Sequence, residues 1–412
     1  MKDIHLLDLI NGASGALDYV SSTVTGHHRR VGVGAVAVGG AMGHGLRDTT
    51  DLLNASLLHD IGAFSLDLRL DGLDFDTDHT DHARAGYRLL KLHPILDRVA
   101  ELVLLHHTPW RRLPAYRDPM VPLLANIVNL VDRVDVLNHK GPRRIDRQRI
   151  RETIRANAGA IFAPEAVTAF LDLSASAAFW DRMSAPWDHV REGIDTPLAD
   201  DVIPHDQLIQ FSRFFSLIID FRSRHTATHS QGVAETAATL ARLTGMTGQD
   251  QERIRLAANL HDIGKLAVPV VLLDKPSTLT PDEFATVRHH ASVCETILHT
   301  VPGLEDIADW ASQHHERTDG SGYPRGLSRD QLSLGSRVMG VADVFTAITE
   351  DRPYRQGMTP AQSTAVLRDM ARTGSLDADL VTLLLDNFKT MAEVRHAVQE
   401  AALARFEQFR AA

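Results

Sequence analysis

The chain has 412 residues, of which 44% are hydrophobic and 23% charged, a balance typical of a globular protein with two or three domains. Its formal net charge of −10 argues against binding to nucleic acid polymers or membrane surfaces, and no apolar run approaches the ~20 residues of a membrane helix. The single Cys294 excludes an internal disulfide framework and, with no signal-peptide pattern at the N-terminus, predicts a cytoplasmic protein.

The predicted secondary structure is helical along the whole chain. A first helix is expected over 6–22, and a similar helix over 205–222 follows a stretch rich in Gly, Pro and Asp at 192–204. Apolar residues at the helical period predict a helix over 229–243, which Gly245 ends. No sustained alternation of polar and apolar residues predicts a strand, so the expected fold class is all-α.

Two further helices are predicted around histidines. A capping box at Thr280 with proline at the first helical position begins a helix whose one face carries His290 and Cys294. A later helix, from about Ile307, places His314 and His315 on one side.

The two halves of the chain carry the same arrangement of histidines and aspartates. His27 lies 32 residues before His59-Asp60, and His229 lies 32 residues before His261-Asp262. In each half a further histidine precedes a His-His pair by 24 residues, and an aspartate follows the pair. Such matching predicts two tandem helical modules, a first module at 1–195 and a second module at 196–412.

Each half supplies seven side chains suited to a metal centre. One histidine on a helix is more often a core or surface residue than a ligand, but seven positions matched between two halves favour ligands. Imidazole and carboxylate suit iron, manganese or zinc. Two such ions ~3.5–4 Å apart activate water for an in-line displacement at phosphorus. The predicted second-module ligands are His229, His261, Asp262, His290, His314, His315 and Asp343, and their first-module counterparts are His27, His59, Asp60, His82, His106, His107 and Asp132.

The second half resembles the HD-GYP family of phosphodiesterases, a branch of the HD superfamily. The resemblance spans about 225–356, and its motifs lie at 261–265, 273–280, 314–324 and 352–355. It implies two tandem HD-type helical bundles, the second an HD-GYP domain. It further implies metal-dependent hydrolysis of cyclic di-GMP to linear pGpG, to GMP or to both. The metals implied are two or three iron or manganese ions, with zinc, nickel, magnesium and cobalt as alternatives.

Roles for single residues also follow from the resemblance. It implies that the seven second-module residues bind the metals, that Asp262 and Lys265 are catalytic, and that Lys265 contacts the substrate phosphate. Arg352 and Arg355 occupy phosphate-binding positions, which suits guanidinium groups, although a solvated loop is the plain alternative. Tyr323 lies in a glycine-rich turn, where it is expected to stack on a guanine, anchor a partner or serve the turn alone.

The second half departs from the family pattern at two positions. Members with a third metal often carry a glutamate four residues before the first ligand, where this chain has His225. Either His225 binds a third ion, which favours complete hydrolysis to GMP, or it is an exposed histidine on a basic segment. Thr346 stands where many members carry a second aspartate after Asp343.

The first module keeps every predicted ligand but loses the features for substrate. Ala63 replaces the lysine, and no Gly-Tyr-Pro turn follows His107. Three interpretations remain: a phosphohydrolase for a different nucleotide, a regulatory module, or a platform for dimerisation. Because catalysis also needs a positioned substrate, regulation or assembly is favoured.

Ligand residues do not read the base of a nucleotide, so other functions stay open. The enzyme alternatives are a mixed guanine-adenine cyclic dinucleotide (cGAMP) or another nucleotide as substrate. A non-catalytic scaffold that binds a cyclic dinucleotide is the alternative from another class. The expected partners are a cyclic dinucleotide and, for assembly, a second copy of the chain or a signalling protein, with no nucleic acid polymer and no membrane.

Overall fold

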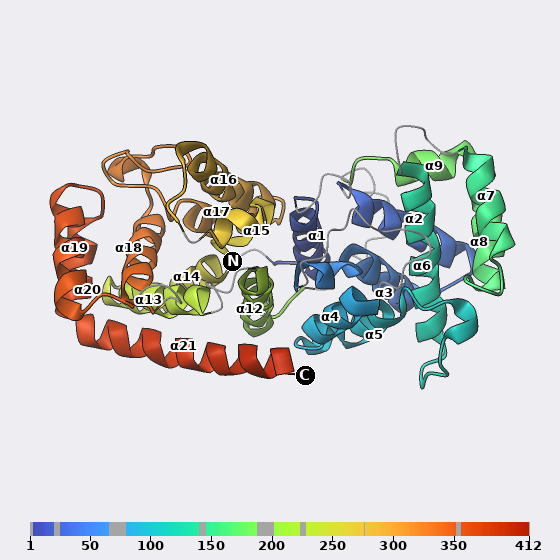
Figure 1. Cartoon of the computed structure of the whole chain (residues 1–412), viewed down its shortest axis with the longest axis horizontal. Helices are drawn as coiled ribbons and strands as arrows, with labels where there is room; N and C mark the ends of the chain where they lie inside the picture. The colour runs from blue at the N-terminus through green and yellow to red at the C-terminus, as the bar shows by residue number, and fades with distance from the viewer. Residues whose placement is uncertain are drawn as a thin grey trace. The chain divides into compact units, whose positions relative to one another are not determined.

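The computed structural model describes residues 3–19, 25–65, 80–139, 146–187, 202–222, 228–275, 277–351 and 356–411. These residues form helices and short 3-10 turns, with three isolated β-bridges and no strand in the described ranges (Figure 1). The all-α prediction is therefore confirmed. No helix in these ranges combines the length and the apolar character needed to cross a bilayer.

The chain divides into two compact units, His5–Val202 and Ile203–Ala412 with Met1–Ile4. They correspond to the first and second modules, and those names are kept for them below. The predicted boundary at 195/196 lies outside the described residues and stays a prediction.

The first module is a bundle of helices that ends with three short ones, α7, α8 and α9. Its core is formed by apolar side chains of α2, α3, α5 and α6, such as Val31, Leu57, Val103 and Leu130, which are fully buried. Its elements are α1 (Leu6–Leu17), α2 (His27–Ala41), α3 (Leu46–Leu58), η2 (Ile61–Ser65), α4 (Thr80–Leu90), η4 (Pro94–Leu96), α5 (Asp97–Leu105), η5 (Trp110–Arg112), α6 (Met120–His139), α7 (Arg147–Ala156), α8 (Pro164–Leu173) and α9 (Ala177–Met183).

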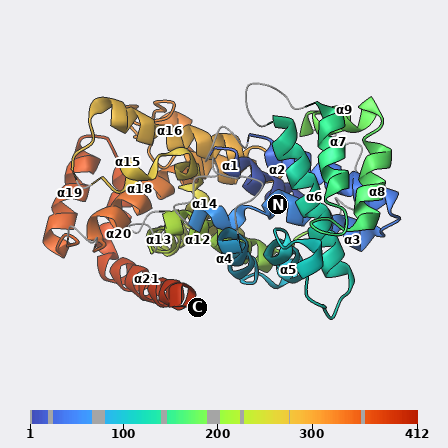
Figure 2. The same cartoon turned by 45° about the vertical axis from the view of Figure 1, so that its right-hand side comes forward.

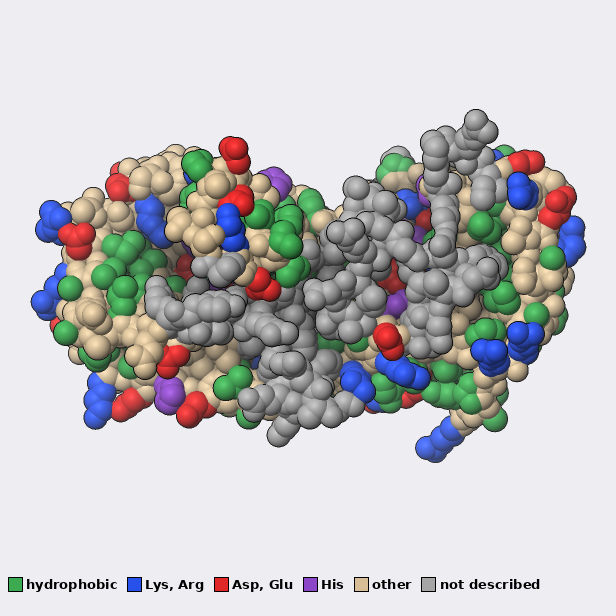
Figure 3. Space-filling model, in the orientation of Figure 1, with side chains coloured by type: hydrophobic (Ala, Val, Ile, Leu, Met, Phe, Trp, Pro, Cys, Tyr) green, Lys and Arg blue, Asp and Glu red, His purple; other side chains and the backbone are tan. Residues whose placement is uncertain are grey.

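The second module repeats this order and adds a long C-terminal helix. Its elements are α12 (His205–Arg222), α13 (His229–Leu243), α14 (Gly248–Leu260), η6 (Ile263–Ala267), α15 (Val270–Leu273), α16 (Pro281–Leu298), α17 (Glu305–Ser312), η7 (Arg329–Gln331), α18 (Leu334–Thr349), α19 (Pro360–Arg372), α20 (Ala378–Asp386) and α21 (Phe388–Ala411). Helix α21 runs alongside α13 in both views (Figures 1 and 2). On the face shown in Figure 3, acidic and basic side chains of this module are interspersed.

Local sequence explains several of these boundaries. Helix α13 spans the predicted 229–243, and Gly245 follows it with φ +86°. Thr280 and Glu283 form the predicted capping box at the start of α16. Two predicted boundaries were wrong: α1 ends at Leu17, before 22, and α17 ends at Ser312, so His314 and His315 lie beyond the helix.

Candidate metal centres in the two modules

In each module the His-Asp pair lies where a helix ends and a 3-10 turn begins. His59 and His261 are the C-terminal caps of α3 and α14, and Asp60 and Asp262 come directly before η2 and η6. The turn packs tightly on the next helix, because a Cβ on Gly62 or Gly264 would lie about 2 Å from a backbone oxygen of that helix. Glycine at this position therefore lets the pair approach the following histidine ligand.

Backbone carbonyls orient five of the ten predicted histidine ligands. The Nδ1 atoms of His59, His106, His261, His290 and His314 each lie 2.6–2.7 Å from the carbonyl oxygen three residues earlier. A carbonyl can only accept, so Nδ1 carries the proton and donates it. That fixes Nε2 as the atom available to a metal, which is the usual arrangement at metal sites.

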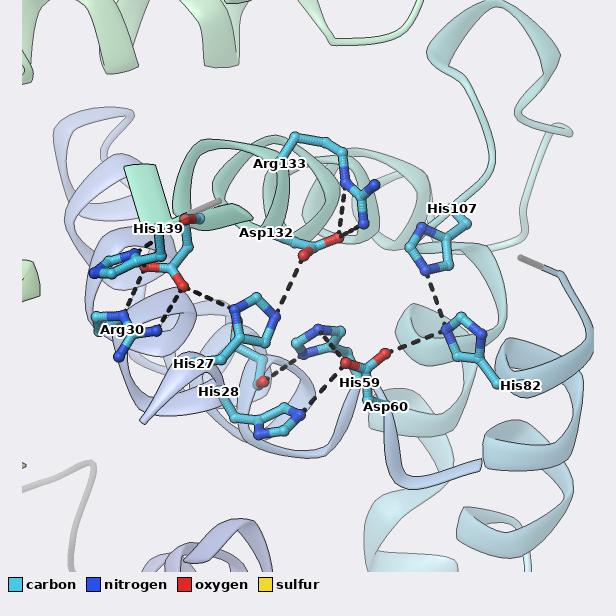
Figure 4. Close-up of polar contacts among 12 residues, drawn as sticks. His27, His28, Arg30, His59, Asp60, His82, His107, Asp132, Arg133 and His139 are labelled. Carbon is cyan, nitrogen blue, oxygen red and sulfur yellow. Dashed lines mark hydrogen bonds and ion pairs between the residues drawn. The ribbon is translucent and has the colours of Figure 1, made fainter. Parts of the chain in front are cut away.

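In the first module the Nε2 atoms of His27, His59 and His82 converge on Asp60 and Asp132 (Figure 4). Asp60 Oδ1 lies 3.2 Å from His82 Nε2, and Asp60 Oδ2 lies 3.3 Å from His59 Nε2. His27 Nε2 lies 3.4 Å from Asp132 Oδ1. Overlapping groups of ligand atoms there could hold an ion, among them His27, His59 and Asp132, then His28, His59 and Asp60, and finally Asp60, His82, His106 and His107.

The second module brings its predicted ligands together in the same way. His229 Nε2 lies 3.1 Å from Asp343 Oδ1, and His261 Nε2 lies 3.3 Å from Asp262 Oδ2. His290 Nε2 lies 3.7 Å from Asp262 Oδ1. The groups that could hold an ion are His229, His261 and Asp343, and His290, His314 and His315.

The chemistry of these groups fits divalent cations. In the first module His27 Nε2, His59 Nε2, His106 Nε2, Asp60 Oδ2 and Asp132 Oδ1 are buried without a hydrogen bond, although buried polar atoms are normally paired. In the second module His290 Nε2 and His314 Nε2 face each other at 3.4 Å, and both rings already donate through Nδ1. A cation between such atoms would satisfy them, and imidazole with carboxylate is the donor set of iron, manganese and zinc sites.

The electrostatics of both centres keep the carboxylates charged. Burial alone would raise the pKa of Asp262, but His261, Lys265 and the neighbouring histidines hold that pKa well below its ordinary value. Burial together with the charge of His315 holds the pKa of His314 well below its ordinary value. Burial lowers the pKa of His290 to about 4. These imidazoles are therefore neutral near pH 7, the form that binds metal.

The leading histidine of each module is the exception. Burial lowers the pKa of His229, but the charges and hydrogen bonds of Glu350 and Asp343 outweigh it and raise the pKa to about 10. For His27, Asp132 and Asp135 outweigh burial in the same way and raise the pKa to about 9. In both modules, therefore, a second carboxylate holds Nδ1 of the leading histidine.

These second carboxylates were not predicted from the sequence. His27 Nδ1 lies 2.8 Å from Asp135 Oδ2, and His229 Nδ1 lies 3.1 Å from both oxygens of Glu350. His28, which is fully buried beside Asp60, was not predicted from the sequence either. The His27-His28 doublet in the sequence was a signal for the latter.

The predicted substrate residues that the structure describes border the second centre. Lys265 Nζ lies 2.6 Å from Asp262 Oδ2, and its side chain is 20% exposed. The Tyr323 ring lies 4.7 Å from that of His315 and 4.5 Å from the Arg288 guanidinium. A cavity of about 410 Å³ is lined by His289 and His290 of α16, the helix that also carries Arg288. His225, Arg352 and Arg355 lie outside the described residues.

The tyrosine-bearing turn is held by a buried glutamate. Glu316, which is 3% exposed, accepts hydrogen bonds from the backbone N–H groups of Arg325 and Leu327. A Cβ on Gly322 would lie 2.3 Å from the backbone nitrogen of Arg317, so the turn folds back closely on the His-His segment. The sequence motif therefore builds a fixed rim that presents Tyr323 beside His315.

Comparison with known proteins agrees with this arrangement. Two HD domain models match the chain, at residues 24–137 and 213–380. The 3'3'-cGAMP-specific phosphodiesterase 1 of Vibrio cholerae is 31% identical over 388 residues, which cover 90% of this chain and 89% of that protein. The chain belongs to the HD-GYP family. The predicted family and the tandem HD arrangement are thereby confirmed.

Two other family members differ in how much they share. A cyclic di-GMP phosphodiesterase of Thermotoga maritima is 36% identical over 152 residues, which cover 36% of this chain and 41% of that protein. The crystal structure of a cyclic GMP-AMP specific phosphodiesterase of V. cholerae, V-cGAP3, superposes with a TM-score of 0.67 at 23% identity and covers 94% of this HD-GYP chain and 98% of that one. That likeness shows the same fold through both HD domains.

Proposed function

We infer that this HD-GYP protein is a metal-dependent phosphodiesterase that hydrolyses a cyclic dinucleotide in its second module. One observation carries the proposal: seven predicted ligands, a lysine on the central aspartate and a tyrosine-bearing rim all lie around one centre there. The names of relatives that share this module support it, since all act on cyclic dinucleotides.

The residues that would hold two cations follow from the distances. His229, His261 and Asp343 would hold one ion, His290, His314 and His315 the other, and Asp262 lies between them. Such a pair supplies a hydroxide nucleophile and neutralises charge at phosphorus. Iron and manganese fit the donor set best, and zinc, nickel, magnesium and cobalt are the alternatives. A third ion at His225 stays a prediction.

The protein's own groups would then position the substrate. Asp262 is held ionised, and Lys265 both donates to it and keeps its side chain partly open to solvent. A cation in that place can hold a phosphate oxygen beside the two-metal centre. Tyr323 and the Arg288 guanidinium offer an aromatic face and a positive charge to the nucleotide at the rim. Arg352 and Arg355 remain proposed phosphate contacts.

Two substrates are in view because the relatives divide between them. Cyclic di-GMP is the substrate implied by the motifs, with pGpG, GMP or both as products. The relative that matches through both modules is specific for 3'3'-cGAMP, and this favours cGAMP as the second candidate.

The decisive experiment is a substrate panel with chromatography of the products. Purified full-length protein, loaded anaerobically with Fe²⁺ or Mn²⁺, is incubated with cyclic di-GMP, 3'3'-cGAMP and linear pGpG, and H261A/D262A serves as the inactive control. We expect linear products from at least one cyclic substrate and none from the control. Binding of a cyclic dinucleotide without any product would instead identify a non-catalytic scaffold. Turnover by H261A/D262A at the wild-type rate would show that the reaction does not take place at the second-module centre.

For the first module we propose metal binding without turnover. His27, His59, Asp60, His82, His106, His107 and Asp132 are the proposed ligands, whereas Ala63 and the missing tyrosine turn remove the two features that serve the substrate in the second module. The module would then regulate the second module or mediate assembly with another copy or a signalling protein.

A further inference from the structure

His28 is an additional buried imidazole at the metal centre of the first module. It follows His27 at the start of α2 and is fully buried. Its ring centroid lies 5.2 Å from that of His27 and 5.1 Å from that of His59. Figure 4 shows its ring directed toward Asp60.

The nitrogens of His28 have no hydrogen bond within the described part of the chain. Nε2 lies 3.4 Å from Asp60 Oδ2, and Nδ1 lies 3.9 Å from Asp18 Oδ1. Asp60 Oδ2 and His59 Nε2 are likewise buried without a hydrogen bond. The ligand atoms of His28, His59 and Asp60 lie within 4.8 Å of one another. Because metal–nitrogen bonds are about 2.0–2.1 Å long, donors on opposite sides of one ion lie about 4 Å apart, which these atoms reach with small rotations.

The second module has no equivalent ligand. Seven ligands match between the modules, but the position of His28 is occupied there by Ser230, whose hydroxyl is buried and without a hydrogen bond. Among the residues that the structure describes, the first centre therefore offers one imidazole more than the centre beside Lys265 and the tyrosine turn.

We propose that His28 is an eighth metal ligand and that it closes the first-module centre. Catalytic metal sites keep a coordination position for water or substrate, whereas structural sites fill every position with protein ligands. His28 fills that position beside His59 and Asp60. Arg133 adds to the closure, since its Nη2 lies 2.6 Å from Asp132 Oδ2 and occupies the second oxygen of that ligand. The first module thus holds a structural metal, independently of what the second module hydrolyses.

The rival interpretation is an ion pair. A protonated His28 between Asp60 and Asp18 would also account for its burial, and in that case His28 would not touch a metal. The two interpretations differ in metal retention and in the access of water to the ion, so they can be separated without measuring turnover.

The test uses the full-length chain with the second centre disabled by H261A/D262A/H314A. In this background, H28S copies the serine of the second module, and H93S removes another buried histidine as the matched control. Each protein is loaded with Mn²⁺ and titrated with a chelator, and retained manganese is counted by mass spectrometry. We expect H28S to lose affinity by at least the roughly 10–100-fold known for groups that only support metal ligands, because His28 would itself bind the ion, and we expect H93S to keep it. Equal retention in H28S and H93S would overturn the proposal.

A second measurement needs no substitution at His28. Water-proton relaxation by bound Mn²⁺ reports water on the ion, and it is compared between the background above and a chain with H59A/D60A, in which only the second centre remains. We expect weak relaxation from the first-module ion and strong relaxation from the second-module ion. Equal relaxation would show that the first centre is open, and the proposal would fail even if H28S did not fold.

Discussion

The two modules orient the leading histidine of the metal centre with carboxylates from different positions. In the first module the carboxylate is Asp135, three residues after Asp132, and Arg30 holds it through contacts of 2.8 and 2.9 Å. In the second module it is Glu350, seven residues after Asp343, and Gln399 Nε2 holds it at 3.1 Å.

Three matched positions have changed together between the modules. The counterparts of Arg30, Asp135 and His139 are Gly232, Thr346 and Glu350. Gly232 leaves the space that Gln399 of α21 fills, since a Cβ there would lie 2.7 Å from Gln399 Nε2. Each centre therefore needs a buried carboxylate on Nδ1 of its leading histidine. That carboxylate can come from either of two positions that lie one helical turn apart. The C-terminal helix takes part in the second centre through this contact.

The largest expected difference between the modules is in turnover. H261A/D262A removes the central aspartate of the second centre, and we expect hydrolysis of the cyclic dinucleotide to fall by about 10⁴-fold or more, as for the loss of a metal nucleophile. The matched pair H59A/D60A should keep turnover within roughly tenfold of wild type, because that centre has neither the lysine nor the tyrosine turn that would position the substrate. The measurement is the initial rate of hydrolysis at saturating substrate for each variant. A comparable loss of rate from both pairs of substitutions would mean that the modules act as one catalytic unit.

A smaller effect is expected at the lysine that only the second module has. K265A removes a cation 2.6 Å from Asp262 Oδ2, and we expect kcat to fall by about 10²–10³-fold, the usual cost of one charge-stabilising donor. Metal content should stay at the wild-type value because Lys265 is not a ligand. The matched variant A63K should give the first module no activity, since the tyrosine turn is missing there. Activity gained by A63K in an H261A/D262A background would contradict this view of the first module.

The fold and a set of candidate ligands could be predicted from the sequence because both depend on patterns that repeat along the chain. The helical period set the limits of α13, and the Thr280 capping box set the start of α16. The predicted ligands come together in each module because the two modules repeat the same order of helices, with ligands at matching positions. They remain predicted as ligands, since the metals are inferred from donor geometry.

The missed residues share a physical reason. Glu350 contacts His229 from the end of α18, and Gln399 of α21 contacts Glu350. Nothing in the spacing of these residues indicates that α21 packs on α13. His28 was passed over because neighbours on a helix point about 100° apart. At the first turn of α2, however, both rings reach the centre. The end of α17 was misplaced because His314 and His315 continue the helical spacing beyond Ser312.

Removing the second carboxylate should weaken metal binding in the second module. E350A leaves Nδ1 of His229 without its acceptor, and we expect the affinity of that centre for Mn²⁺ to fall by about 10–100-fold, as for other groups that orient metal ligands. The double variant E350A/T346D moves the carboxylate to the position used by Asp135 and should recover part of the loss. Manganese retained against a chelator is the measurement, in the H59A/D60A background so that only the second centre counts. An E350A protein that binds manganese like wild type would show that Glu350 only fills space.

The smallest effect concerns pH, and its sign follows from the histidine pKa values. With its pKa raised to about 10, His229 is protonated in the metal-free chain at neutral pH, whereas His290, at about 4, is already neutral. A metal must displace the His229 proton, so the affinity should rise by about tenfold per pH unit between pH 6 and 8.5. In E350Q the neutral amide no longer raises that pKa, and the rise should level off at a lower pH. Isothermal titration with Mn²⁺ in buffers of different ionisation enthalpy counts the released proton. The same slope in both proteins would mean that Glu350 does not control the proton on His229, and that the exchanged carboxylates of the two modules differ in more than position.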